Sequence, residues 1–80
     1  MDNRIGLTPR QQEVLAFIVQ YYREEGYYPF LKEICEGKIN GEQVIKKVSS
    51  RGTITLVLEC LERKGYLKRE KGSPRAMCVL

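Results

Sequence analysis

The stretch of sequence that decides the fold is residues 49–80, SSRGTITLVLECLERKGYLKREKGSPRAMCVL. Its first half predicts a helix over about residues 50–64, because two serines offer N-caps at the start and a glycine follows the end. The apolar residues of this helix recur at helical spacing and predict a core-facing stripe of Ile54, Val57, Leu58 and Leu61. Residues 66–69 and 76–80 are predicted to be short strands, joined by a basic turn. A hairpin this small needs a helical partner, so the stretch predicts a helix with a hairpin packed beside it.

The strongest local signal upstream is the start of a helix over residues 9–25. Thr8 is a good N-cap, proline occupies the first helical position, and Gln11 completes a capping box. Apolar residues follow with a helical period, and Gly26 supplies the stop. This helix is therefore predicted to contribute one apolar face to the core.

The segment between the two long helices contains weaker signals. A proline keeps residues 27–29 extended and predicts a short β-like piece, and a short helix is predicted over residues 30–36. Asn40-Gly41 is a turn signal. Residues 42–48 are predicted to form an extra helix, with a strand as the alternative, because three apolar residues share one helical face: Val44, Ile45 and Val48.

The predicted order is helix, short strand, helix, extra helix, helix and hairpin. This is the order of a winged helix-turn-helix, a mainly α fold with a small β-hairpin. Eighty residues with 42% hydrophobic content are enough for one compact domain, so residues 1–80 are expected to be a single winged helix-turn-helix domain.

Composition removes several classes of function. The absence of histidine deletes the commonest general base and most zinc sites. The three cysteines, at positions 35, 60 and 78, form no C-x-x-C pair, and their odd number argues against a disulfide framework. We therefore expect no enzyme activity, no metal and no cofactor. No signal peptide or apolar run long enough to span a membrane is present, so a cytoplasmic protein is expected, nucleoid-associated when bound to DNA.

The charge is concentrated in the second half of the chain. The whole sequence has a net charge of +4, with 14 basic and 10 acidic residues. Residues 1–40 sum to −1, whereas residues 41–80 sum to +5. A basic half that carries the last helix and the hairpin fits an anionic partner met by one face, and this pattern favours double-stranded DNA.

The candidate DNA contacts lie in two groups. The start of the last helix combines a positive dipole end with hydrogen-bond donors, and a helix fits the major groove. Its candidate residues are Ser49, Ser50, Arg51, Gly52, Thr53, Thr55 and Leu56. The hairpin, or wing, near residues 68–75 is expected to contact phosphates through Lys68, Arg69, Lys71 and Arg75.

The chain resembles the DNA-binding domain of the LexA repressor family. LTPRQQEV at residues 7–14 is similar to the family opening L-T-x-R-Q-Q-E-V, and three further matches follow in order: Gly26-x-x-Pro29, Glu33-Ile34 and Leu58-x-x-Leu61-x-Arg63-Lys64-Gly65. The resemblance covers nearly the whole chain apart from residues 38–48. It implies a winged helix-turn-helix that binds operator DNA and represses transcription. A homodimer, at least on DNA, is a separate expectation.

Three departures from the family pattern change what the resemblance implies. Residues 38–48 replace the family's short turn before the recognition helix. The family's S-P-N-A-A-E-E falls on residues 50–56, where only Ser50 is retained and the base-reading positions become Gly52, Thr55 and Leu56. A different operator is therefore expected. The family's self-cleaving and dimerising domain does not follow, so autocleavage is not expected, and a dimer would need another surface.

Leu56 and the function itself each leave alternatives open. Leu56 is predicted to point away from the core, where it touches a thymine methyl, packs in a dimer, or is covered by the extra helix. The leading function is a sequence-specific regulator, most simply a repressor. The alternative is a protein-interaction winged helix, an antirepressor or a transcription adaptor. Glu59 and Glu62 on the last helix favour the alternative, whereas Arg51 and the basic wing favour DNA.

Overall fold

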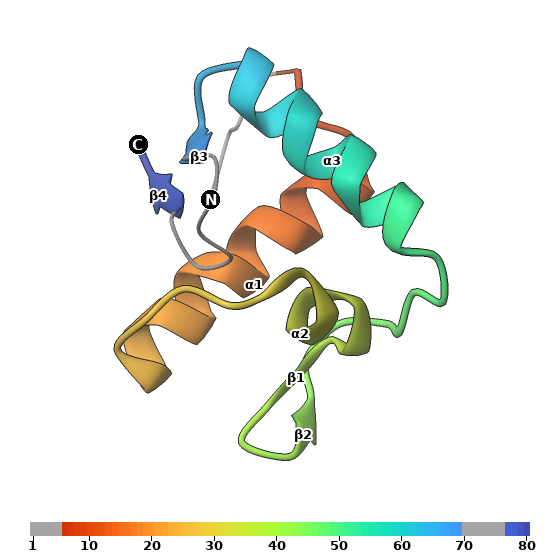
Figure 1. The fold of residues 1–80 in the computed structure, drawn as a ribbon, viewed down its shortest axis with the longest axis vertical. Helices are drawn as coiled ribbons and strands as arrows, with labels where there is room; N and C mark the ends of the chain where they lie inside the picture. The colour runs from red at the N-terminus through yellow and green to blue at the C-terminus, as the bar shows by residue number, and fades with distance from the viewer. Residues whose placement is uncertain (1–5, 70–76) are drawn as a thin grey trace.

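The computed structural model describes residues 6–69 and 77–80. Three helices pack around one core, and two small antiparallel hairpins lie at its edges (Figure 1). The fold is a mainly α winged helix-turn-helix, as predicted. The elements are α1 (Pro9–Glu25), α2 (Leu31–Glu36), β1 (Lys38–Ile39), β2 (Glu42–Gln43), α3 (Arg51–Arg63), β3 (Leu67–Arg69) and β4 (Met77–Val79).

The predicted start and end of α1 are confirmed. The Thr8 hydroxyl accepts a hydrogen bond from the Gln11 backbone N–H at 3.2 Å, and the Gln11 side chain accepts one from the Thr8 N–H at 3.1 Å. Gly26 ends the helix in the left-handed region with φ 84°. The Lys64 ammonium, beyond the end of α3, donates to the Gln11 side chain at 3.1 Å and to the Gly6 carbonyl. The first turn of α1 is thereby tied to the end of α3.

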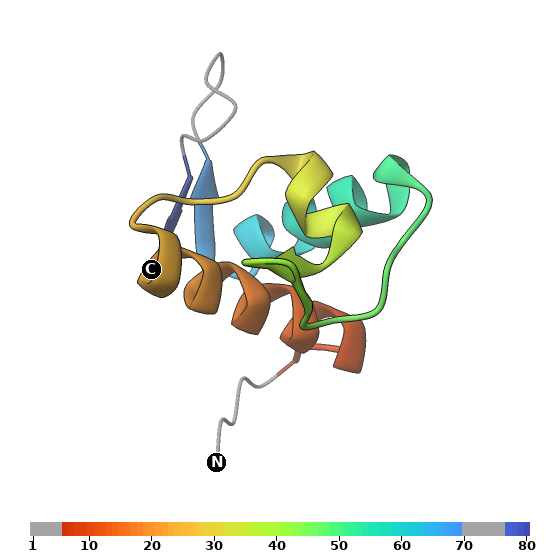
Figure 2. The ribbon, with the colours of Figure 1, turned by 90° about the horizontal axis from the view of Figure 1, so that it is seen from below.

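The core lies where α1, α2 and α3 meet. Figure 2 shows α2 and α3 on the same side of α1. Phe17, Ile34 and Ile54, one from each helix, are at most 1% exposed. The stripe predicted for α3 is buried at all four positions. This packing fixes the angle between α2 and α3, which form the helix-turn-helix.

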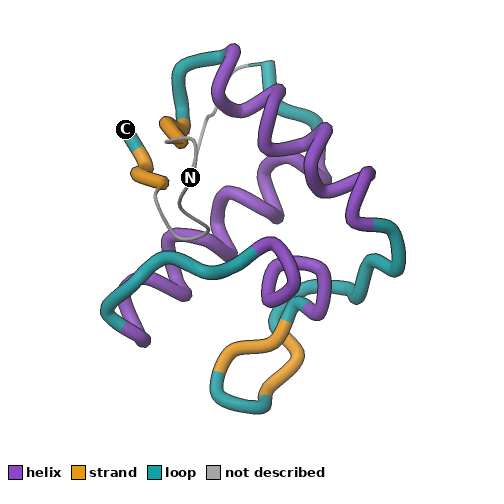
Figure 3. Tube along the Cα trace, viewed as in Figure 1, coloured by secondary structure: helices purple, strands orange, loops and turns teal. Residues whose placement is uncertain are grey.

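The extra helix predicted over residues 42–48 is wrong. Residues 38–43 form the β1–β2 hairpin, and the following residues 44–50 are loop (Figure 3). Asn40 and Gly41 have φ 52° and 81°, the left-handed pair that a two-residue type I′ hairpin turn requires. The turn signal was therefore correct, and it closes a hairpin whose Ile39 side chain is buried in the core.

Hydrogen bonds to α2 explain why residues 44–50 are not helical. The backbone N–H groups of Val44 and Val48 donate at 2.8 Å to the carbonyls of Gly37 and Cys35, at the end of α2. In a helix over residues 42–48, the Val48 N–H would instead donate to the Val44 carbonyl. Ile45 and Val48 pack against the core from the loop, so the apolar spacing that suggested a helix reflects two separate anchors.

The strand predicted over residues 27–29 is also absent. The Tyr28 ring stacks on Tyr22, with ring centroids 4.2 Å apart, and the Tyr28 hydroxyl accepts a hydrogen bond from the Val79 backbone N–H at 3.4 Å. A side chain thus satisfies an outward-facing donor of β4 that a third strand would have paired.

The predicted wing strands are confirmed. β3 and β4 pair antiparallel, with Leu67 opposite Val79 and Arg69 opposite Met77. Leu67 and Met77 are buried, which seats the wing on the core next to α3. Among the residues that the structure describes, no helix is both long enough and apolar enough to cross a bilayer.

Candidate nucleic-acid interface

The N-terminus of α3 is built by a serine cap. Ser50 is the N-cap, and its hydroxyl accepts a hydrogen bond from the Thr53 backbone N–H at 3.4 Å. Ser49 lies one residue outside the cap and is exposed. No acidic residue occurs in the first turn of α3, so the positive end of the helix dipole is not neutralised there.

The two faces of α3 differ sharply in burial. Ile54 and Leu61 on the inner face are fully buried, whereas Leu56 on the outer face is 63% exposed. Gly52 and Glu59 are exposed on the same outer face, and Thr53 and Thr55 are half-buried at its margins. The expectation that an extra helix covers Leu56 is wrong, because residues 44–50 form a loop that runs to the start of α3 (Figure 3).

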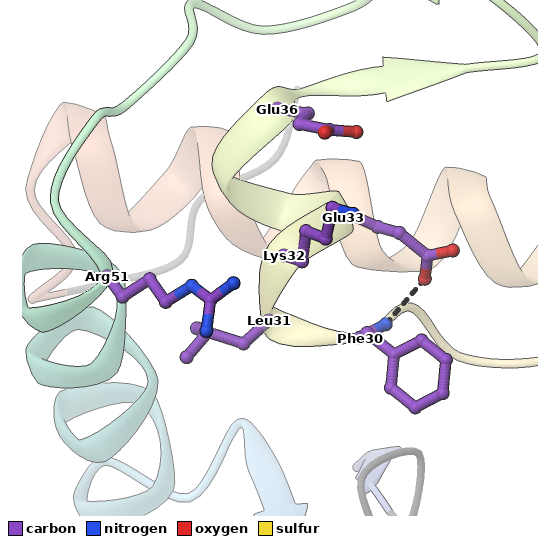
Figure 4. Close-up of a pocket in the computed structure, with 6 residues that line it drawn as sticks. All are labelled: Phe30, Leu31, Lys32, Glu33, Glu36 and Arg51. Atoms are coloured by element: carbon purple, nitrogen blue, oxygen red, sulfur yellow. Dashed lines mark hydrogen bonds between the residues drawn. The ribbon is translucent and has the colours of Figure 1, made fainter.

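Arg51 lies over a hollow between α2 and α3. The hollow has a volume of about 730 Å³ and is lined by Phe30, Leu31, Lys32, Glu33, Glu36 and Arg51. Figure 4 shows the Arg51 side chain extending from α3 towards Leu31. The Glu33 carboxylate points elsewhere, where it accepts a hydrogen bond from the Phe30 backbone N–H at 2.6 Å.

The contact between α2 and α3 also affects Cys35. Burial raises the pKa of the Cys35 thiol above its usual value, although the Arg51 guanidinium partly offsets this by favouring the thiolate. The thiol is therefore a buried neutral group at the joint of the helix-turn-helix. Cys60 is half-buried and Cys78 is exposed, and all three cysteines are free thiols.

The predicted wing contacts fall into three situations. Lys68 is exposed on β3. Arg69 is half-buried and forms an ion pair with Glu62 of α3, with 2.9 Å between Nε and Oε1. Lys71 and Arg75 lie outside the described residues.

Lys32 is a basic residue of this region that the sequence analysis passed over. It is exposed on α2 and lines the same hollow as Arg51. The available signal was its place in the first turn of the helix before the recognition helix. Within residues 6–69 and 77–80 no cluster of acidic and cysteine side chains is arranged to hold a metal ion.

Comparison with known proteins agrees with this geometry. The family model described as LexA DNA binding domain matches residues 4–76. The chain is 45% identical over 75 residues to LexA repressor 1 of Geobacter sulfurreducens, covering 92% of this chain and 33% of that protein. It is 38% identical to the LexA repressor of Caldicellulosiruptor saccharolyticus, with coverages of 92% and 33%, and 44% identical to that of Thermobifida fusca, with 89% and 25%. The chain thus spans about a third or less of the length of these relatives. With a family model matching nearly its whole length, the chain belongs to the LexA DNA-binding domain family.

Proposed function

We propose that this protein represses transcription by binding a specific double-stranded DNA sequence. In this proposal α3 enters the major groove and the wing contacts the adjacent backbone. The observation that carries it is the outer face of α3, which is exposed from its N-cap to Glu59 while the opposite face is buried. A helix anchored on one side and open on the other is what insertion into a groove about 12 Å wide requires.

The first turns of α3 supply the base-reading and orienting groups. Ser49 and Ser50 lie where backbone N–H groups and the helix dipole favour phosphate. Arg51 is long enough to reach a guanine edge or a phosphate, while Gly52, Thr53, Thr55 and Leu56 face the bases or the groove wall. Lys32 of α2, beside Arg51, adds a phosphate contact.

The wing supplies contacts that position the domain without reading sequence. Lys68, Lys71 and Arg75 are proposed to bind phosphates. Arg69 is proposed to act differently, because its ion pair with Glu62 ties the wing to α3. It orients the wing, and contributes less to phosphate binding than its neighbours.

We propose that residues 1–80 act as one domain and that two copies bind a two-fold symmetric operator in the cytoplasm. Symmetric half-sites match the two-fold symmetry of a homodimer. The relatives are repressors by name, and repression follows if the operator overlaps a promoter.

The test is a binding titration on random-sequence duplex at two salt concentrations, followed by selection of an operator from a random library. Contacts to about four to six phosphates predict a steep fall of affinity with salt. Arg51→Ala should weaken operator binding, whereas Arg23→Ala, which removes an exposed cation on the last turn of α1, should not. Failure of the folded wild-type protein to bind any duplex at low salt would refute the proposal.

The second candidate function is a protein-interaction module. Exposed Glu59 and the apolar Leu56 on α3 favour it, because neither is a phosphate contact. Glu62 favours it less, since its carboxylate is already paired with Arg69. Folded protein that ignores DNA but binds a component of a transcription complex through α3 would support this second function.

A further inference from the structure

The outer face of α3 has an unusual chemical character for a helix that reads DNA. Gly52, Thr55, Leu56 and Glu59 are spaced so that they share one face over two helical turns. None of them is an arginine, lysine, asparagine or glutamine, the residues that make bidentate hydrogen bonds to guanine or adenine. Thr55 and Glu59 can each make single hydrogen bonds to a base edge, whereas Leu56 can contact only an apolar group.

Leu56 is the most prominent group on this face. Its side chain is 63% exposed at the middle of α3, and it belongs to none of the core contacts of the described residues. A single exposed leucine is ordinary on a protein surface. Its position matters here, because Leu56 lies in the second turn of α3, and the N-terminal part of a recognition helix is the part that contacts base edges in the major groove.

Gly52, one turn before Leu56, is not required by the fold. Its φ is not in the left-handed region, and a β-carbon there would meet only the Ser50 hydroxyl at an ordinary contact distance of 3.6 Å. Glycine costs helix stability relative to alanine. Because this exposed position has no side chain, the helix backbone next to Leu56 can approach the surface of a bound partner closely.

Resting on the proposed function, we infer that Leu56 reads the 5-methyl group of a thymine in the operator. That methyl is the one apolar group that the bases present in the major groove. Leu56 buries its exposed side chain against it, and Gly52 lets the helix come close enough for the contact. The operator half-site then contains a thymine opposite Leu56 that is selected without a hydrogen bond.

The experiment uses the operator obtained by selection and replaces each thymine in turn by uracil, which removes only the methyl group. For the wild-type protein, replacement of one particular thymine per half-site should lower the affinity for the operator about fourfold, which is the effect of one buried methyl-sized group. The Leu56→Ala variant should bind the thymine operator more weakly. The ratio of its affinities for the thymine and uracil operators at that position should fall to about one. The matched control is Leu80→Ala, which removes an equally exposed leucine (68%) outside α3 and should keep the ratio.

A second variant tests the part played by Gly52. Gly52→Ala should leave thermal stability unchanged or raised, because alanine favours helix. Its operator affinity should fall, and the thymine-to-uracil ratio should shrink with it. Unchanged affinity in this variant would remove the close-approach part of the inference.

The outcomes separate this inference from the function on which it rests. A defined operator with no uracil effect at any position, or a uracil effect that persists in Leu56→Ala, overturns the reading by Leu56 but leaves DNA binding intact. A Leu56→Ala variant that loses dimerisation in sedimentation and keeps the uracil effect also overturns it, and assigns Leu56 to a contact between copies. Only failure to bind any duplex removes the proposed function itself.

Discussion

At the scale of single residues, Gly37 is the described glycine whose surroundings leave least room for a side chain. It ends α2 with φ 69°, and a β-carbon there would collide with the Ile45 carbonyl oxygen. That carbonyl belongs to the loop whose N–H groups bond back to the end of α2. The path of residues 38–48 therefore depends on glycine at position 37, which has no side chain to block it.

Gly37→Ala should lower the free energy of unfolding by more than about 1 kcal/mol, because left-handed strain and the collision add. The measurement is urea denaturation. Gly41→Ala is the control, since Gly41 has φ 81° but open space around it. That variant should therefore lose only the stability that the left-handed conformation costs an alanine. Equal losses in the two variants would contradict the role of the Ile45 contact.

Cys35 gives a residue-scale prediction for pH. Burial raises the pKa of its thiol above the usual value of 9.0, so the unfolded chain releases this proton at lower pH than the folded one. The stability linked to Cys35 is therefore fully present below about pH 9 and is lost as pH rises through the folded pKa. Under reducing conditions, the free energy of unfolding of Cys35→Ala should fall less between pH 8 and pH 10 than that of the wild type. Parallel falls would exclude a buried neutral thiol.

At the scale of elements, a partly exposed ion pair joins α3 to the described part of the wing. Glu62 and Arg69 have side chains that are 32% and 31% exposed, so the pair is expected to contribute less than about 1 kcal/mol to stability. In the proposed complex with DNA, the pair holds a wing cation against α3 and away from a phosphate.

Glu62→Gln should therefore cost little stability and tighten DNA binding. Removal of the negative charge frees Arg69 for a phosphate, and the slope of log affinity against log salt should steepen by about one. Glu13→Gln, at an exposed position of α1, changes the net charge equally and should leave the slope unchanged. If both variants tighten binding alike, the effect comes from net charge and not from Arg69.

At the scale of the whole molecule, both elements that we propose contact DNA belong to the basic half of the sequence. The half of the sequence with charge +5 contains both α3 and the wing. Figure 2 shows α1 beneath α2 and α3. In the proposed complex, a single domain binds one half-site. Two half-sites centred about 34–36 Å apart would accommodate two copies on the same face of the duplex.

The whole-molecule prediction is that a selected operator is two-fold symmetric and binds two chains. Sedimentation of the complex with a full operator should give a stoichiometry of two, and an isolated half-site should bind one chain more weakly. Insertion of five base pairs between the half-sites rotates one of them by about half a helical turn, so it should reduce binding by two chains to that of separate half-sites. A full-affinity complex of one chain with a single asymmetric site would contradict the homodimer.

The sequence by itself determined the elements whose signals are local. The Thr8–Gln11 capping box, the apolar stripe of α3 and the alternation of turn and strand signals in the wing each act within a few residues, so α1, α3 and the β3–β4 hairpin lie where they were predicted. The first and last of the family motifs, at residues 7–14 and 58–65, lie largely on α1 and α3.

Only the tertiary structure decided the segments whose hydrogen-bond partners are distant in sequence. Residues 42–48 had a helical apolar spacing, but the end of α2 offered carbonyls to the N–H groups of Val44 and Val48. Residues 27–29 had strand-forming composition, but the Tyr28 hydroxyl, not its backbone, met β4. The exposure of Leu56 and the pairing of Arg69 with Glu62 have the same origin. Each depends on which groups from other elements arrive nearby, and a pattern within one short segment contains no information about that.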